Sequence, residues 1–88
     1  MTRLDPAHVA WCRQHFAMMA DGGTWAIPRS GMIFNKRGNT LVLAVVMPHM
    51  NGMPCTPEEL IAQQRDEFEN CREHFAAAGV TVINEALP

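Results

Sequence analysis

The longest apolar run of the chain, from Leu41 to Pro48, has the length of one β-strand. It is shorter than a membrane span, which needs about 18 apolar residues. Within this segment (Thr40–Met47) the apolar side chains do not alternate with polar ones. Both faces of the strand are therefore expected to be covered, by a helix on one side and by a partner on the other. The run predicts a sheet that is apolar on both faces.

The chain has 88 residues, of which 48% are hydrophobic and 18% are charged. This length predicts one domain covering residues 1–88, and the composition is too apolar for a disordered chain. A domain of this size buries only roughly 60–65% of its unfolded surface. Self-association would bury apolar surface that one copy leaves exposed.

Two segments have the spacing of amphipathic helices. The first begins at Asp5-Pro6 and ends before Asp21-Gly22-Gly23, and the second begins at the capping box Thr56-Pro57-Glu58-Glu59 and ends at Gly79. The predicted inward residues of the first helix are Val9, Cys12, Phe16 and Met19. Those of the second are Ile61, Gln64, Phe68, Cys71, Phe75 and Ala78.

Three further segments are β-prone: Thr24–Ile27, Met32–Asn35 and Val80–Ile83. The resulting order is α-β-β-β-α-β. We therefore predict a two-layer α+β fold, in which an antiparallel sheet carries two helices packed on one face.

The α-β-β-β-α part of this order resembles the double-stranded RNA-binding domain. That family contacts phosphates with basic residues at the start of its second helix. Here the position reads Pro57-Glu58-Glu59, which would repel phosphate. With a net charge of −2, the chain is also not a polycation that would bind nucleic acid through overall positive charge. The resemblance is limited to topology, and we expect neither a nucleic-acid nor a membrane partner.

The two predicted helices share a short sequence: residues 12–17 read CRQHFA and residues 71–76 read CREHFA. An ancient duplication, or two helices packing similar residues on one sheet, would explain this. If the two helices lay side by side, two thiolates and two imidazoles could coordinate one zinc ion tetrahedrally. These ligands would be Cys12, His15, Cys71 and His74. However, both cysteines fall on the apolar stripes, where a free cysteine packs as a small hydrophobe. We therefore predict no metal or other cofactor.

The loop Met47–Cys55 holds three thioethers, an imidazole and a thiol, a donor set that suits Cu(I). Methionines also make adaptable contact surfaces, so Met50 and Met53 are candidate partner contacts. Ser30 is the sole serine and stands in a predicted turn. A Cys55–His49 pair is conceivable as nucleophile and base, but we expect Cys55 to be partly buried. No catalytic residues are predicted.

Charge is distributed unevenly along the chain. Residues 58–88 contain seven acidic and two basic residues. Three basic residues, Arg29, Lys36 and Arg37, lie on the turns around the second predicted strand. This asymmetry could steer one copy toward another, or it could be solvated surface charge.

The chain starts without an apolar leader and has three well-separated cysteines, so we expect reduced thiols and a cytoplasmic protein. The predicted function is a small protein–protein interaction module that forms a homodimer. Adaptors, inhibitors and chaperones of bacteria and phages include compact acidic proteins of this size. The alternative is a metal- or thiol-dependent protein that uses the Cys/His set or the methionine-rich loop.

Overall fold

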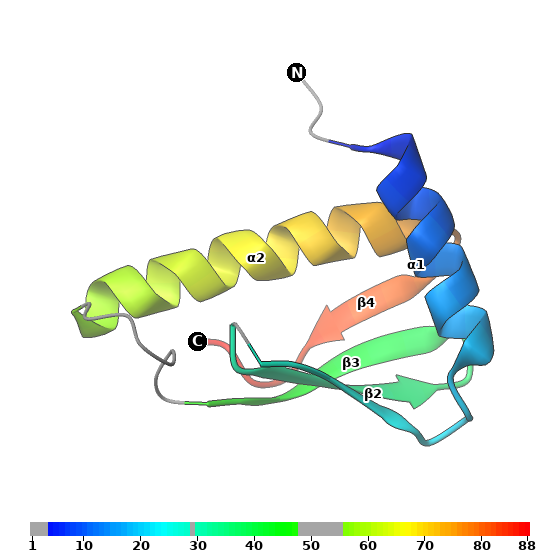
Figure 1. Cartoon of the computed structure of the whole chain (residues 1–88). Coiled ribbons are helices and arrows are strands. Elements are labelled where there is room, and N and C mark those ends of the chain that lie inside the picture. The colour runs from blue at the N-terminus through cyan, green and yellow to red at the C-terminus, as the bar shows by residue number, and fades with distance from the viewer. Residues whose placement is uncertain (1–3, 29, 48–55) are drawn as a thin grey trace.

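A computed structural model describes residues 4–28, 30–47 and 56–88 (Figure 1). The elements, in chain order, are α1 (Pro6–Met18), β1 (Thr24–Ile27), β2 (Met32–Arg37), β3 (Thr40–Val46), α2 (Pro57–Ala77) and β4 (Thr81–Asn84). The predicted order α-β-β-β-α-β and the α+β class are confirmed.

The four strands lie in the order β1-β2-β3-β4. The β1–β2 and β2–β3 pairs are antiparallel, as predicted, whereas β4 runs parallel to β3. The sheet is thus mixed, and the expectation of an antiparallel sheet is corrected at its last strand. The reason is α2, whose 21 residues extend about 31 Å and return the chain to the end of the sheet where β3 begins.

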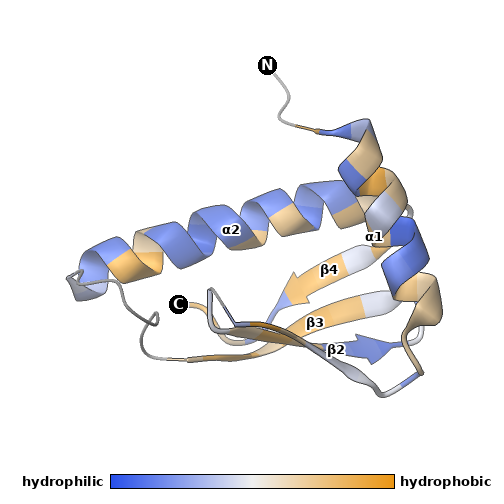
Figure 2. Cartoon of the chain, viewed as in Figure 1, coloured by the Kyte–Doolittle hydropathy of each residue, from blue (hydrophilic) through white to orange (hydrophobic). Residues whose placement is uncertain are grey.

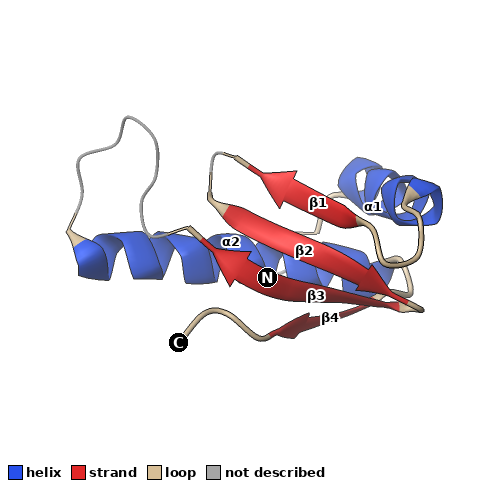
Figure 3. Ribbon diagram, turned by 90° about the horizontal axis from the view of Figure 1, so that it is seen from below, coloured by secondary structure: helices blue, strands red, loops and turns tan. Residues whose placement is uncertain are grey.

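Both helices lie on one face of the sheet (Figure 1). The view from below shows the strands in front of α2, with α1 beside β1 (Figure 3). α1 crosses the C-terminal end of α2 (Figure 1). Between the layers lies a core that joins both helices to all strands, with its most deeply buried side chains at Cys12, Met32, Phe34, Leu41, Leu43 and Phe75. The predicted inward stripes are confirmed for Cys12, Phe16, Gln64, Phe68, Cys71 and Phe75.

A β-bulge in β3 sets the side to which the last residues of this strand point. Ile33 pairs with Val45 and Phe34 pairs with Leu43, so Ala44 is the extra residue. Leu41 and Leu43 face the helices by regular alternation, whereas the bulge turns Val45, at 47% exposure, to the opposite side of the sheet. With Val42 and Val45 on that side, β3 is apolar on both faces.

Side-chain caps begin both helices where the sequence predicts. The Asp5 carboxylate accepts a hydrogen bond from the Ala7 amide at 3.0 Å, and the Thr56 hydroxyl accepts one from the Glu59 amide at 3.1 Å. α2 ends beside Gly79, whose φ of 87° lies in the left-handed region that glycine adopts without strain.

We expect Thr56→Ala to lower the free energy of unfolding by about 1 kcal/mol, because the Glu59 amide loses its acceptor. Urea denaturation followed by circular dichroism measures this change. Thr56→Ser keeps the hydroxyl and should unfold near the wild-type midpoint. Equal midpoints for Thr56→Ala and the wild-type protein would show that the cap contributes nothing.

Candidate interaction surface

The sheet face opposite the helices is called the open face here. Its side chains follow from the strand register, since paired residues point to the same side and neighbours along a strand point to opposite sides. From β1 to β4, the open face consists of Thr24, Ala26, Ile33, Asn35, Arg37, Thr40, Val42, Val45, Thr81 and Ile83.

Half of these residues are apolar, and they adjoin one another across all four strands. Val45 and Ile83 are 47% and 45% exposed, and Met47, just after β3, is 43% exposed. β3 and β4 are coloured as hydrophobic along most of their length, while the outer side of α2 is largely hydrophilic (Figure 2). Exposed apolar side chains gathered on one face usually mark a contact site.

One ion pair lies across the open face. The Arg37 guanidinium on β2 is 3.7 Å from the Glu85 carboxylate just after β4, and both side chains are about half exposed. Val42, on β3 between β2 and β4, is only 1% exposed although it does not belong to the core cluster. An exposed ion pair of this kind adds little stability.

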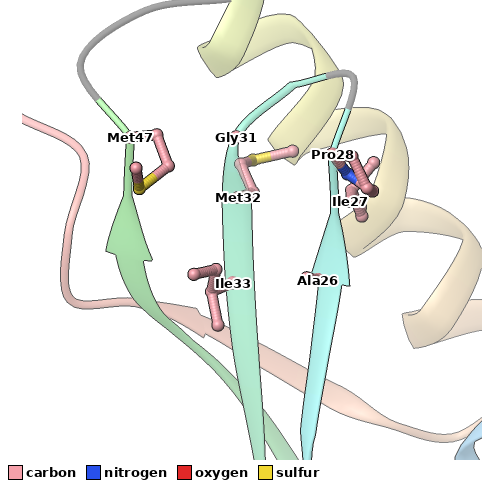
Figure 4. Close-up of a pocket in the computed structure, with 7 residues that line it drawn as sticks. All are labelled: Ala26, Ile27, Pro28, Gly31, Met32, Ile33 and Met47. Atoms are coloured by element: carbon pink, nitrogen blue, oxygen red, sulfur yellow. The ribbon is translucent and has the colours of Figure 1, made fainter.

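A hollow of about 330 Å³ lies at the end of the sheet where β1 and β3 finish and β2 begins. Its lining is mainly apolar, and Figure 4 shows the residues around it: Ala26, Ile27, Pro28, Gly31, Met32, Ile33 and Met47. Ala26 and Ile33 also belong to the open face. The hollow therefore extends the apolar surface of that face.

Gln64 on α2 holds the rim of this hollow in place. Its amide nitrogen donates to the Ser30 carbonyl at 3.1 Å and to the Met47 carbonyl at 3.2 Å. This buried polar side chain thereby joins the β1–β2 turn to the end of β3. The sequence placed Gln64 in the apolar stripe of α2, and a polar residue at such a position is the signal that could have indicated this role.

The two cysteines of the predicted zinc set are buried in the core. Cys12 is 0% and Cys71 is 8% exposed. Burial raises the pKa of Cys12 to about 11. Burial, with smaller contributions from Cys12 and Glu67, raises the pKa of Cys71 to about 12. Both thiols are therefore protonated at neutral pH, whereas metal binding and nucleophilic attack need the thiolate.

The two histidines of the set have separate structural roles. The His74 ring donates from Nδ1 to the Asn70 carbonyl at 2.7 Å and accepts at Nε2 from the Asp5 amide at 3.0 Å. Both of its nitrogens are therefore engaged. His15 instead stacks on Trp11 and meets Trp25 edge-on, with ring centroids 4.6 and 4.7 Å away. In the part of the chain that the structure describes, no three histidine, cysteine, aspartate or glutamate residues form a possible metal site.

The basic and methionine candidates are divided among different regions. Arg37 lies on the open face. The Lys36 ammonium donates to the Phe16 and Met19 carbonyls at the end of α1, so it acts within the chain. Arg29, Met50 and Met53 lie outside the described residues, as does the predicted loop Met47–Cys55 apart from Met47.

An aromatic stack that was not predicted from the sequence lies along α1. His8 and His15 lie on either side of Trp11, nearly parallel to it, and Trp25 of β1 joins this group. The signal was the spacing i, i+3, i+7, which puts three flat rings on one side of a helix.

Neither helix in the described residues has the length and hydrophobicity required to cross a membrane. The chain matches no known family model, no curated protein and no solved structure.

Proposed function

We propose that this protein is a protein–protein interaction module that forms a homodimer through its open face. The observation that carries the proposal is the exposed apolar side chains of Val45 and Ile83 on the sheet face opposite both helices. In a two-fold dimer, identical patches of this kind cover each other. The hollow beside Ile33 and Met47 gives room for an apolar side chain of the second copy.

Charge on the open face supports a second copy as the occupant. The face carries one base, Arg37, and the adjacent chain supplies one acid, Glu85. Two identical faces therefore meet without net repulsion, and each arginine can pair with either glutamate. A strongly charged partner would find no complementary field there.

The area of the open face indicates the affinity to expect for this dimer. The accessible surface is 5437 Å², close to the roughly 5200 Å² expected for a compact monomer of this mass. One copy thus exposes about as much surface as a compact monomer of this mass. Strands of 4, 6, 7 and 4 residues, with a rise of about 3.3 Å per residue and a spacing of about 4.8 Å, give a projected area of roughly 330 Å². This is below the about 800 Å² per partner of a standard interface, so we expect micromolar dissociation.

Sedimentation equilibrium from about 1 to 500 µM, a range bracketing micromolar dissociation, tests the proposal. The wild-type chain should change reversibly from monomer to dimer. Ile83→Glu places a charge in the centre of the interface and should leave the chain monomeric throughout. Met18→Glu is the matched control, because Met18 is 85% exposed on α1, away from the open face. That variant should dimerise like the wild-type chain.

Two results would overturn the proposal: a wild-type chain that is monomeric at the highest concentration, or an Ile83→Glu variant that dimerises normally. The second result would point to pairing through the free edge of β1, which does not involve Ile83. Thermal melts of both variants show whether each is folded.

A cytoplasmic location remains part of this proposal. The metal-dependent alternative now depends on the methionine-rich loop, since the His74 nitrogens are already bonded and both described thiols are protonated at neutral pH. Elemental analysis of the purified protein tests it directly. A stoichiometric metal would favour this alternative over the interaction module.

A further inference from the structure

We propose that the ion pair between Arg37 and Glu85 meets the same ion pair of a second copy inside the dimer, where the four charged groups alternate in sign and select a second copy as the partner of the open face. The two residues thereby gain a role within the dimer, so the inference rests on the proposed function. It is carried by the position of the ion pair among the exposed apolar side chains of this face.

The ion pair lies within the open face and not along one edge of it. Arg37 is the last residue of β2, where it pairs with Thr40 of β3. On the other side of β3, the Glu85 backbone N–H donates to the Leu43 carbonyl at 3.0 Å. The Arg37 Nη1 and the Glu85 Oε1 are 3.7 Å apart, so the two side chains approach each other from either side of β3.

A second copy that covers the exposed apolar side chains of this face also reaches the ion pair. Val45 of β3 is 47% exposed and Ile83 of β4 is 45% exposed, while the Arg37 and Glu85 side chains are both about half exposed. Arg37 belongs to β2 and Glu85 follows β4, so the pair spans the strands that carry both apolar side chains. Covering Val45 and Ile83 therefore also removes water from the pair.

The alternating arrangement is the favourable way to remove this water. If each pair faced only apolar residues of the second copy, both charges would lose their water and gain no new partner, which is costly. If arginine faced arginine and glutamate faced glutamate, like charges would repel across the interface. When each guanidinium instead contacts the carboxylates of both copies, charge-assisted hydrogen bonds replace the lost water.

The same arrangement selects a second copy over other apolar partners. Arg37 is the only charged residue of the open face, and Glu85 adjoins that face. A different protein would need an acid and a base at this spacing between apolar side chains to fit equally well. A second copy supplies both through a two-fold axis. Because an exposed ion pair adds little stability to a single chain, we expect its effect in the choice of partner.

Reversal of one charge at a time tests the alternating network. Arg37→Glu leaves two acids at each face and Glu85→Arg leaves two bases, so each variant repels its own copies. In an equimolar mixture, the acidic face and the basic face attract each other. By sedimentation equilibrium, we expect each variant alone to dimerise at least about tenfold more weakly than the wild-type chain, and the mixture to return to within about threefold of the wild-type dissociation constant.

The ion pair between Glu69 and Arg72 provides the matched control. Both side chains are about half exposed, and they lie on α2, in the layer opposite the open face (Figure 1). Arg72→Glu changes the formal net charge from −2 to −4, as Arg37→Glu does, and Glu69→Arg changes it to 0, as Glu85→Arg does. The two control variants and their mixture should dimerise like the wild-type chain. Thermal melts establish whether each variant is folded.

The possible failures can be told apart. If the wild-type chain dimerises, Ile83→Glu does not, and both reversals at Arg37 and Glu85 dimerise normally, the open face forms the dimer and the ion pair lies outside the contact. If the reversals weaken the dimer and mixing does not restore it, the charges do not alternate across the interface. Equal effects in the control variants would show that net charge is responsible, which also contradicts the network. A wild-type chain that stays monomeric overturns this inference and the proposed function together.

Discussion

Lys36→Met is expected to lower the free energy of unfolding by about 3 kcal/mol, because it removes two hydrogen bonds from a charged donor. The ammonium donates to the Phe16 carbonyl at 2.7 Å and the Met19 carbonyl at 2.9 Å. These carbonyls lie at the end of α1, where a positive charge also interacts favourably with the helix dipole. The same ammonium lies 4.3 Å from the centroid of the Phe16 ring. Methionine keeps the length of the side chain but supplies none of these interactions.

Arg37→Met is the matched control, since it removes the neighbouring charge on the same strand. Its ion pair with Glu85 is exposed, so we expect a change within about 0.5 kcal/mol. Urea denaturation of both variants, analysed with a common slope, gives the comparison. Similar midpoints for the two variants would mean that Lys36 does not cap α1.

The second prediction compares the two histidines of the repeated sequence. His74→Phe is expected to lower the free energy of unfolding by about 2 kcal/mol, because the Asp5 amide loses its acceptor inside the protein. His15→Phe is expected to raise it by up to about 1 kcal/mol, because it removes the buried Nε2, which has no hydrogen-bond partner among the described residues, and keeps a ring against Trp11 and Trp25.

Thermal and urea denaturation at pH 7.5, above the ordinary histidine pKa, keeps titration out of this comparison. The informative result is that the two changes in the free energy of unfolding have opposite signs. The same substitution is made at equivalent positions of the repeated sequence, residues 12–17 and 71–76. If both variants lose similar stability, the hydrogen bonds of His74 are not what distinguishes the two sites.

Local patterns were sufficient to predict the elements of this fold. The apolar stripe of each helix, the caps at Asp5 and Thr56 and the glycine after α2 depend on residues a few positions apart. Sequence spacing reports such interactions directly. The doubly apolar character of β3 was also visible, although the bulge at Ala44 that turns Val45 to the open face was not.

The residues of the candidate sites were predicted less completely. The repeated Cys/His spacing suggested a metal set, but the fold buries both thiols and gives both His74 nitrogens backbone partners. A pattern of donor types could not show this, because the Asp5 amide that bonds His74 lies 69 residues away in the chain.

The sequence by itself determined the number and order of the helices and strands and their approximate limits, because periodicity, caps and turn residues act over short distances. The second strand extends further than predicted, through Lys36 and Arg37. Only the tertiary structure decided the direction of β4, the use of Lys36 as a cap and the different surroundings of His15 and His74. These features depend on which distant groups meet when the helices pack on the sheet. That packing is settled by burial of the whole core, not by any local pattern.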